Sequence, residues 1–233
     1  TVDFLFYWFH RWGHEINILW AAHSPHHSSE EFNLSVGLRA SLTQRLLSFS
    51  MFWPLTLIGF EPNHIYIATG VHLILGYWHH TKLIPKLGWF EFLFNSPSHH
   101  RVHHGTNEQY LDKNYAEILI MWDRLFGTFE EEKEEVRYGI LRHPGTYSTY
   151  GINFHFWSLL WQDCKETKSW WNKLRLWFMP LGWRPEDVSF REKVKPIPIG
   201  TPKLFKTQAY NDSRLYLIIQ FIVTLFFMFR NWL

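Results

Sequence analysis

The sequence predicts an all-α protein, an integral membrane bundle of helices. Three observations lead to this expectation. Apolar runs of helical length recur along the chain, and we find no convincing strand alternation between them. Aromatic residues make up 19% of the 233 residues, and charged residues also only 19%, where globular domains carry about 25% charge. Trp and Tyr are the residues that gather at membrane borders.

Composition also excludes several classes of protein. The 23 basic and 21 acidic residues leave a net charge of +2, so nothing points to a nucleic-acid partner. The single Cys164 excludes an intrachain disulfide and a cysteine-based zinc site. The mean hydropathy of −0.21 does not argue for a soluble protein, because this scale scores Trp, Tyr and His as polar.

The first half of the chain contains three expected helical segments. Residues 4–22 form an aromatic-rich helix, and residues 46–60 and 65–78 form a helix–turn–helix hairpin around Gly59, Pro62 and Asn63. Each arm of the hairpin has about 15 residues, or about 22 Å of helix, against a hydrocarbon core of about 30 Å. We therefore expect buried helices, tilted half-spans, or spans that neighbouring residues extend.

The second half is expected to divide into an interfacial part and a terminal helix. Residues 85–130 mix helix and loop signals, and the acidic run 130–135 is expected in solvent. Residues 169–182 alternate aromatic and basic side chains, which indicates a helix in the membrane interface, with an ordinary surface helix as the alternative. Residues 184–206 are rich in Pro and Lys and predict an extended linker. Residues 215–229 predict a short terminal membrane helix.

Basic residues suggest how that terminal helix is oriented. Five precede it and one follows it, which places its N-terminal end in the cytoplasm. The expected regions are thus a catalytic region at 1–130, a cytosolic or interfacial segment and linker at 131–206, and the membrane helix at 207–233. A His-rich site is expected to cap the helices on the cytosolic side.

Histidines form three motifs among the apolar segments. An HxxxH motif places two imidazoles four residues apart on one helix face, and two HxxHH motifs follow it. Pro25, inside the second motif, suggests that a helix starts there, with Ser24 as its N-cap. The motif histidines, in order, are His10 and His14; His23, His26 and His27; and His100, His103 and His104.

The number of imidazoles predicts two metal ions. Nitrogen ligands suit zinc, copper, iron or nickel, and a single ion takes four to six ligands. Carboxylates are scarce in the motifs, which argues against a carboxylate-bridged di-iron bundle; Glu15 is the exception. We assign five other histidines to ordinary polar or interfacial positions: His64, His72, His99, His143 and His155.

The order and spacing of these motifs resemble the fatty acid hydroxylase/sterol desaturase superfamily of integral membrane di-iron enzymes. Further stretches narrow the resemblance to the branch that hydroxylates alkylglycerol ether lipids. The similarity is dense over about residues 3–130 and looser beyond. The stretches that carry it are 7–17, 26–35, 95–107, 112–116 and 120–129, and residues 180–185 show a weaker similarity.

This resemblance implies further site residues and cofactors. It adds an isolated histidine as a ligand, here His80, with His79 as the adjacent competitor. It assigns Glu15 a role beside the metal or on the side of a pterin. It implies two iron ions, O2, tetrahydrobiopterin as electron donor, an ether lipid substrate and a place in the endoplasmic reticulum membrane. Members of this branch carry membrane helices before the first motif, and we expect those helices to be missing from this sequence.

Other functions stay open at this stage. A sterol or fatty acyl hydroxylase or desaturase of the same superfamily would use the same ligands with electrons from a cytochrome. A metal-binding membrane protein without turnover is a non-enzymatic alternative. A zinc hydrolase would work without O2.

Overall fold

The computed structural model describes residues 1–141, 144–188, 218–219 and 221–223. Over these residues the chain is helical, and its β contacts there are two isolated bridges, Ile16–Pro180 and Phe94–Leu119. The all-α prediction is confirmed for the part of the chain that the structure describes. The helices are α1 Val2–Glu15, α2 Asn17–His27, α3 Leu34–Gly37, α4 Leu42–Phe52, α5 Pro54–Leu57, α6 Pro62–His79, α7 Pro97–His103, α8 Met121–Phe126, α9 Thr149–Glu166 and α10 Trp170–Arg175, with 3-10 turns η1 Gly88–Phe92 and η2 Glu108–Tyr110.

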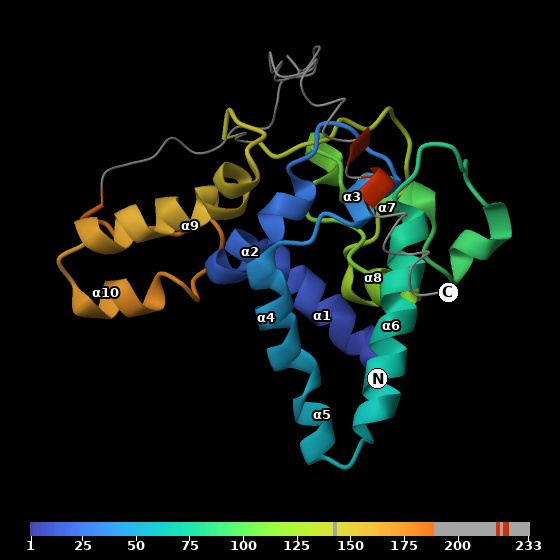
Figure 1. Ribbon diagram of the computed structural model, residues 1–233, viewed down its shortest axis with the longest axis horizontal. Helices are drawn as coiled ribbons and strands as arrows, with labels where there is room; N and C mark the ends of the chain where they lie inside the picture. Colours follow the sequence, from blue (N-terminus) through green and yellow to red (C-terminus); the bar gives the residue numbers. More distant parts are fainter. Residues whose placement is uncertain (142–143, 189–217, 220, 224–233) are drawn as a thin grey trace.

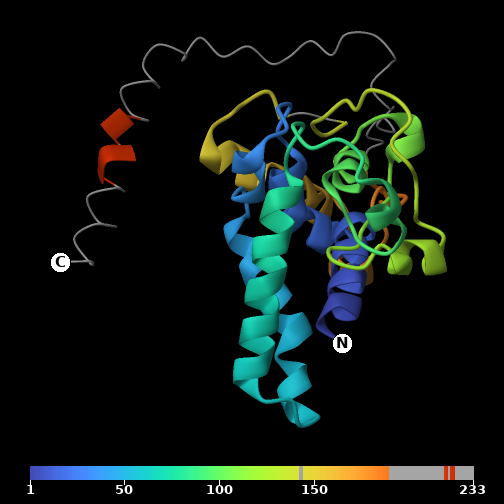
Figure 2. The same ribbon diagram turned by 90° about the vertical axis from the view of Figure 1, so that its right-hand side faces the viewer.

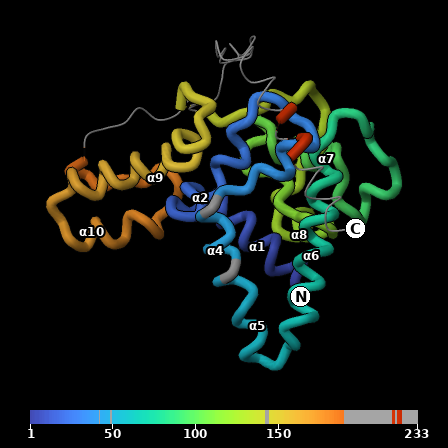
Figure 3. Tube along the Cα trace, in the orientation of Figure 1, coloured from blue at the N-terminus to red at the C-terminus, as the bar shows by residue number. Residues whose placement is uncertain are grey.

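The prediction of one helix over 4–22 was wrong, because the chain bends between α1 and α2 (Figure 3). Ile16 is extended, with φ −113° and ψ 131°. The segment after α10 takes over the backbone hydrogen bonds at this point: the amide of Asn17 donates to the carbonyl of Met179, and that of Leu181 donates to the carbonyl of Glu15. Residues 4–22 contain no proline, and their one glycine, Gly13, lies inside α1, so we attribute the bend to this distant contact.

The expectation that a helix starts at Pro25 was also wrong. Pro25 lies inside α2, in its last turn. A proline removes one helical hydrogen bond, and α2 ends two residues later, where the amide and hydroxyl of Ser28 both donate to the Pro25 carbonyl. The second histidine motif therefore sits on the C-terminal end of one helix.

The predicted hairpin is present as α4 and α5 followed by α6 (Figures 1 and 2). Gly59 has a positive φ of 98° in the turn between them, a conformation that glycine adopts without strain. Many apolar side chains of the hairpin are exposed, among them Leu57, Ile58, Tyr66 and Ile74. Within the described residues, no helix combines the length and the apolar character needed to cross a membrane.

Helices α9 and α10 form a second arm beside α2 (Figure 1). Helix α9, which the sequence did not predict, packs Leu160 with Ala21 of α2 and Leu176 in one buried cluster. Of the segment 169–182, only α10 is helical, and Trp170 and Trp171 on it are exposed.

The acidic run 130–135 is largely in solvent, although Glu132 pairs with the buried Arg101 at 2.7 Å. The predicted terminal helix lies outside the described residues except at 218–219 and 221–223, and most of the linker lies outside them.

Candidate metal centre

The nine histidines expected as metal ligands meet at one place, between α1, α2, the end of α6 and α7. They form two groups, and within each group one nitrogen of every imidazole lies within 4.8 Å of the others. The first group contains His10, His14, His23, His27 and His103, and the second contains His26, His80, His100 and His104.

Helical periodicity explains this division of the motifs. With 3.6 residues per turn, the fourth residue along a helix lies about 40° to one side of the first, and the third residue lies about 60° to the other side. His23 and His27 therefore enter the first group while His26 enters the second. For the third motif the assignment to groups is reversed. His100 and His104, four residues apart, enter the second group, whereas His103 enters the first. The rings of His27 and His104 stack with centroids 4.2 Å apart, so the two groups adjoin.

The spacing of the nitrogens suits ligands around an ion. In the first group, the Nε2 of His23 lies 3.2 Å from the Nε2 of His10 and 3.0 Å from that of His27. In the second group, the Nε2 of His80 lies 3.2 Å from that of His26 and 2.9 Å from that of His100. Ligands about 2.1 Å from one ion lie about 3.0 Å apart in octahedral geometry and about 3.4 Å apart in tetrahedral geometry.

Backbone carbonyls orient three of these imidazoles. The Nδ1 of His10 lies 2.7 Å from the carbonyl oxygen of Tyr115, that of His80 lies 2.7 Å from Gly76 O, and that of His103 lies 3.0 Å from Lys113 O. A carbonyl only accepts, so each Nδ1 carries the proton and donates it. Each Nε2 is then left with a lone pair, which is the arrangement of metal-bound histidines.

Burial keeps the imidazoles neutral. It lowers the pKa of His10 and of His80 to about 4, and it lowers the pKa values of the other seven well below the usual range, with neighbouring histidines adding to the effect. The Nε2 atoms of His14, His103 and His104 are buried without a hydrogen-bond partner. Buried lone pairs without donors are costly, and a cation that they coordinate removes that cost. The residues therefore fit bound metal ions.

A buried carboxylate holds the segment that supplies two of these carbonyls. The side chain of Asp123 on α8 accepts hydrogen bonds from the backbone amides of Tyr115 and Ala116 at 2.8 Å and from the hydroxyl of Thr128 at 2.7 Å. Asn114, with a positive φ of 54°, donates to the backbone carbonyls of His99 and Glu130 and accepts a hydrogen bond from the backbone amide of Glu130. In the sequence these stretches carry only the family resemblance, and no local pattern predicts a role for Asp123 or Asn114.

The remaining residues of interest lie outside both groups. The carboxylate of Glu15 is 43% exposed and accepts a hydrogen bond from Arg11 Nε at 2.8 Å. His79 is buried, and its Nδ1 lies 3.9 Å from the carboxylate of Glu117.

Four further histidines also lie elsewhere. His72 faces Asp3 at 3.7 Å, His99 lies against the ring of Phe129, His64 is exposed, and His155 is half-buried on α9. The expectation for His143 falls on a residue outside those described. None of these residues enters either group, so the structure separates them from the nine.

The chain is similar in sequence to several known enzymes over almost its whole length. The chain is 40% identical over 229 residues to alkylglycerol monooxygenase from Homo sapiens, covering 97% of this chain and 51% of that protein. It is 46% identical over 226 residues to the enzyme of the same name from Danio rerio, with 96% and 50% coverage. For the Xenopus tropicalis enzyme the identity is 44% over 226 residues, again with 96% and 50% coverage.

The chain thus spans about half the length of these relatives. No solved structure matches it. Residues 1–128 match the fatty acid hydroxylase family, and this range contains all nine histidines of the two groups. The chain belongs to the fatty acid hydroxylase family.

Proposed function

We propose that this chain is the catalytic part of a membrane di-iron monooxygenase that cleaves the ether bond of alkylglycerol lipids. The observation that carries the proposal is the pair of adjoining histidine groups, each with enough neutral imidazoles for one ion. The substrate class comes from the relatives named alkylglycerol monooxygenase. The place in the endoplasmic reticulum membrane comes from resemblance alone.

The two groups would hold iron, which would supply the chemistry for O2-dependent hydroxylation of the carbon beside the ether oxygen. The hydroxylated ether is a hemiacetal, which collapses to a fatty aldehyde and a glycerol derivative. One oxygen atom enters the lipid, and the other leaves as water with two protons and two electrons. Tetrahydrobiopterin is proposed as the two-electron donor, again by resemblance.

The chain's own residues hold the imidazoles in position for this chemistry. The carbonyls of Tyr115, Lys113 and Gly76 fix the orientation of three rings. Burial lowers the pKa values of the imidazoles, so that protons do not compete with a metal ion for the nitrogen lone pairs. Nitrogen ligands alone would also accept zinc. Dependence on O2 separates the proposed oxygenase from a zinc hydrolase, because hydrolysis needs none.

Glu15 remains our candidate for a residue beside the metal or on the side of the pterin. It directly follows His14, which belongs to the first group, and its carboxylate is accessible while paired with Arg11. Glu15→Gln should lower turnover while leaving the metal content unchanged. Unchanged turnover would reduce Glu15 to a surface ion pair with Arg11.

Contact with the membrane is proposed through two surfaces. The hairpin α4–α6 exposes apolar side chains along its length, with Tyr66 80% and Ile74 72% exposed. Helix α10 exposes Trp170 and Trp171 and carries Lys173 in its last turn, a combination that is typical of membrane interfaces.

The test is product analysis on the full-length protein loaded with iron. We expect release of a fatty aldehyde from a 1-O-alkylglycerol, only with O2 and only with added tetrahydrobiopterin. Oxidation of a sterol or fatty acyl chain with electrons from a cytochrome would favour the other enzymes of the superfamily. Anaerobic turnover would favour a hydrolase. Bound metal without oxygen uptake on any lipid would favour a metal-binding protein.

A further inference from the structure

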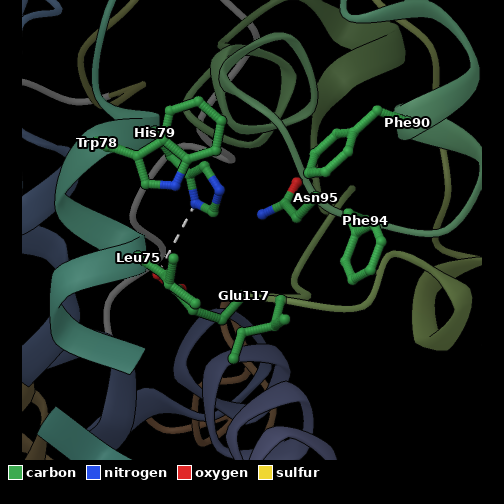
Figure 4. Close-up of a pocket in the computed structure, with 8 residues that line it drawn as sticks. Leu75, Trp78, His79, Phe90, Phe94, Asn95 and Glu117 are labelled. Atoms are coloured by element: carbon green, nitrogen blue, oxygen red, sulfur yellow. Dashed lines mark ion pairs between the residues drawn. The ribbon is translucent and has the colours of Figure 1, made fainter. Parts of the chain in front are cut away.

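A cavity of about 230 Å³ lies against the last turns of α6, outside the two histidine groups (Figure 4). Aromatic side chains form much of its wall, notably Trp78, Phe90 and Phe94. Three polar residues share the wall: His79, Asn95 and Glu117. The His79 ring lies 5.7 Å from the ring of His100, measured between centroids, so the cavity sits beside the second group.

Two polar groups at this wall lack a hydrogen bond. The Nδ1 of His79 is buried without a hydrogen-bond partner. Within the described part of the chain, no hydrogen bond reaches the carboxyl group of Glu117, whose side chain is 7% exposed. The 3.9 Å between Glu117 Oε1 and His79 Nδ1 is too long for a direct hydrogen bond.

The fold keeps the Glu117 carboxyl in this place at a cost. Its Oε1 presses against the backbone of α6 at Gly76, where a Cβ would overlap it, so a larger residue at 76 would displace the carboxyl. Burial raises the pKa of Glu117 to about 8, so the group carries a proton at neutral pH. A buried carboxyl and a buried imidazole nitrogen that face each other at 3.9 Å without a hydrogen bond destabilise the protein until a further group bonds to them.

We propose that this cavity binds the glycerol end of the lipid substrate, with one hydroxyl group bridging Glu117 and the Nδ1 of His79. The assignment rests on the proposed function. A hydroxyl both donates and accepts, so it can bridge a carboxyl oxygen and an imidazole nitrogen whichever of the two holds the proton. Neither an alkyl chain nor a carbonyl could satisfy both groups.

The size and surroundings of the cavity agree with this occupant. Pockets for whole drug-sized ligands measure about 300–1,000 Å³, so this smaller cavity suits one end of a lipid. Val71, one turn before Leu75 on the same face of α6, is 45% exposed and offers an apolar path for the alkyl chain. The glycerol end would thereby hold the ether carbon near the second histidine group.

The test measures binding to the full-length protein loaded with zinc, which binds nitrogen ligands without redox turnover. Its probes are 1-O-hexadecylglycerol and hexadecyl methyl ether, which lacks the hydroxyls. We expect the native protein to prefer the glycerol lipid. Glu117→Leu should weaken its binding by about tenfold and abolish the preference, with metal content unchanged. Glu117→Gln, which keeps a donor and an acceptor, should retain part of the preference.

Glu61→Gln is the matched control, because Glu61 is an exposed carboxylate at the start of the same helix. It should bind both lipids as the native protein does. A native-like preference in a folded Glu117→Leu protein would overturn the proposed subsite. Failure of the proposed function gives a different result, namely no aldehyde release by the iron-loaded native protein.

Discussion

The Nε2 atoms of His80 and His100 lie 2.9 Å apart, although the two residues come from different helices. His80 directly follows α6, the second arm of the hairpin that projects from the rest of the molecule (Figure 2). His100 lies on α7. Their other neighbours in the second group are His26 from α2 and His104. An ion in this group would therefore join three parts of the chain.

Removing the metal should destabilise the fold. A ligand at one hundred times its dissociation constant adds about 2.7 kcal/mol to the free energy of unfolding. For a protein of this size that corresponds to a rise in Tm of about 5–10 °C. Chelation should lower the Tm by this amount in the native protein and in His64→Ala alike, since His64 is exposed and outside both groups. An unchanged Tm after complete chelation would contradict the prediction.

Acid should weaken metal binding and, separately, the metal-free fold. The pKa values of His10 and His80 are lowered to about 4 by burial, against an ordinary value of 6.5. The unfolded chain thus takes up protons first, and stability is lost as the pH falls from about 6.5 toward 4. Urea unfolding of the metal-free protein at pH 7.5 and 5.5 measures this. Equal stability at both values would show that these imidazoles are not buried and neutral.

Two glycines of α6 should respond oppositely to substitution. Gly76→Ala drives a methyl group into the Glu117 carboxyl and should cost about 1–3 kcal/mol of stability. Gly70→Ala meets open space on the same helix and should gain up to about 1 kcal/mol from helix propensity. Denaturant unfolding of the two variants decides the matter. Equal effects would mean that the Glu117 side chain does not rest on Gly76.

Asp123 should affect the affinity for metal, because it holds the backbone segment whose carbonyls orient His10 and His103. Asp123→Asn replaces an acceptor of two backbone amides by a side chain with only one oxygen, so the carbonyls of Tyr115 and Lys113 lose their support. We expect a 10- to 100-fold loss of metal affinity, the usual effect of changing a partner of a ligand. Asp187→Asn is the control, because Asp187 also accepts a backbone amide but lies on the surface away from the histidines. Equal metal affinity in both variants would contradict the prediction.

The histidines could be found from the sequence because their spacing is local. His23 and His27 are four residues apart and share one group, whereas His26 enters the other, a division that follows from helix geometry. The bend at Ile16 could not be found in this way, since it depends on hydrogen bonds to residues more than 160 positions away.

The Asp123 and Glu117 contacts were missed for the same reason. A single carboxylate carries no local pattern, and its partners are backbone groups or a distant helix. Helix α9 was overlooked because its aromatic residues form no clear apolar stripe in the sequence; it is positioned by packing against α2.

Metal content per chain tests the central claim most directly. The native full-length protein should hold about two ions, and His64→Ala should hold the same number. The double variants His10→Ala/His14→Ala and His80→Ala/His100→Ala, one for each group, should each retain about one ion, and neither should turn over substrate. Single replacement of His100, His103 or His104 by Ala should also lower bound metal and abolish turnover. Full metal content and full activity in His103→Ala would contradict the account.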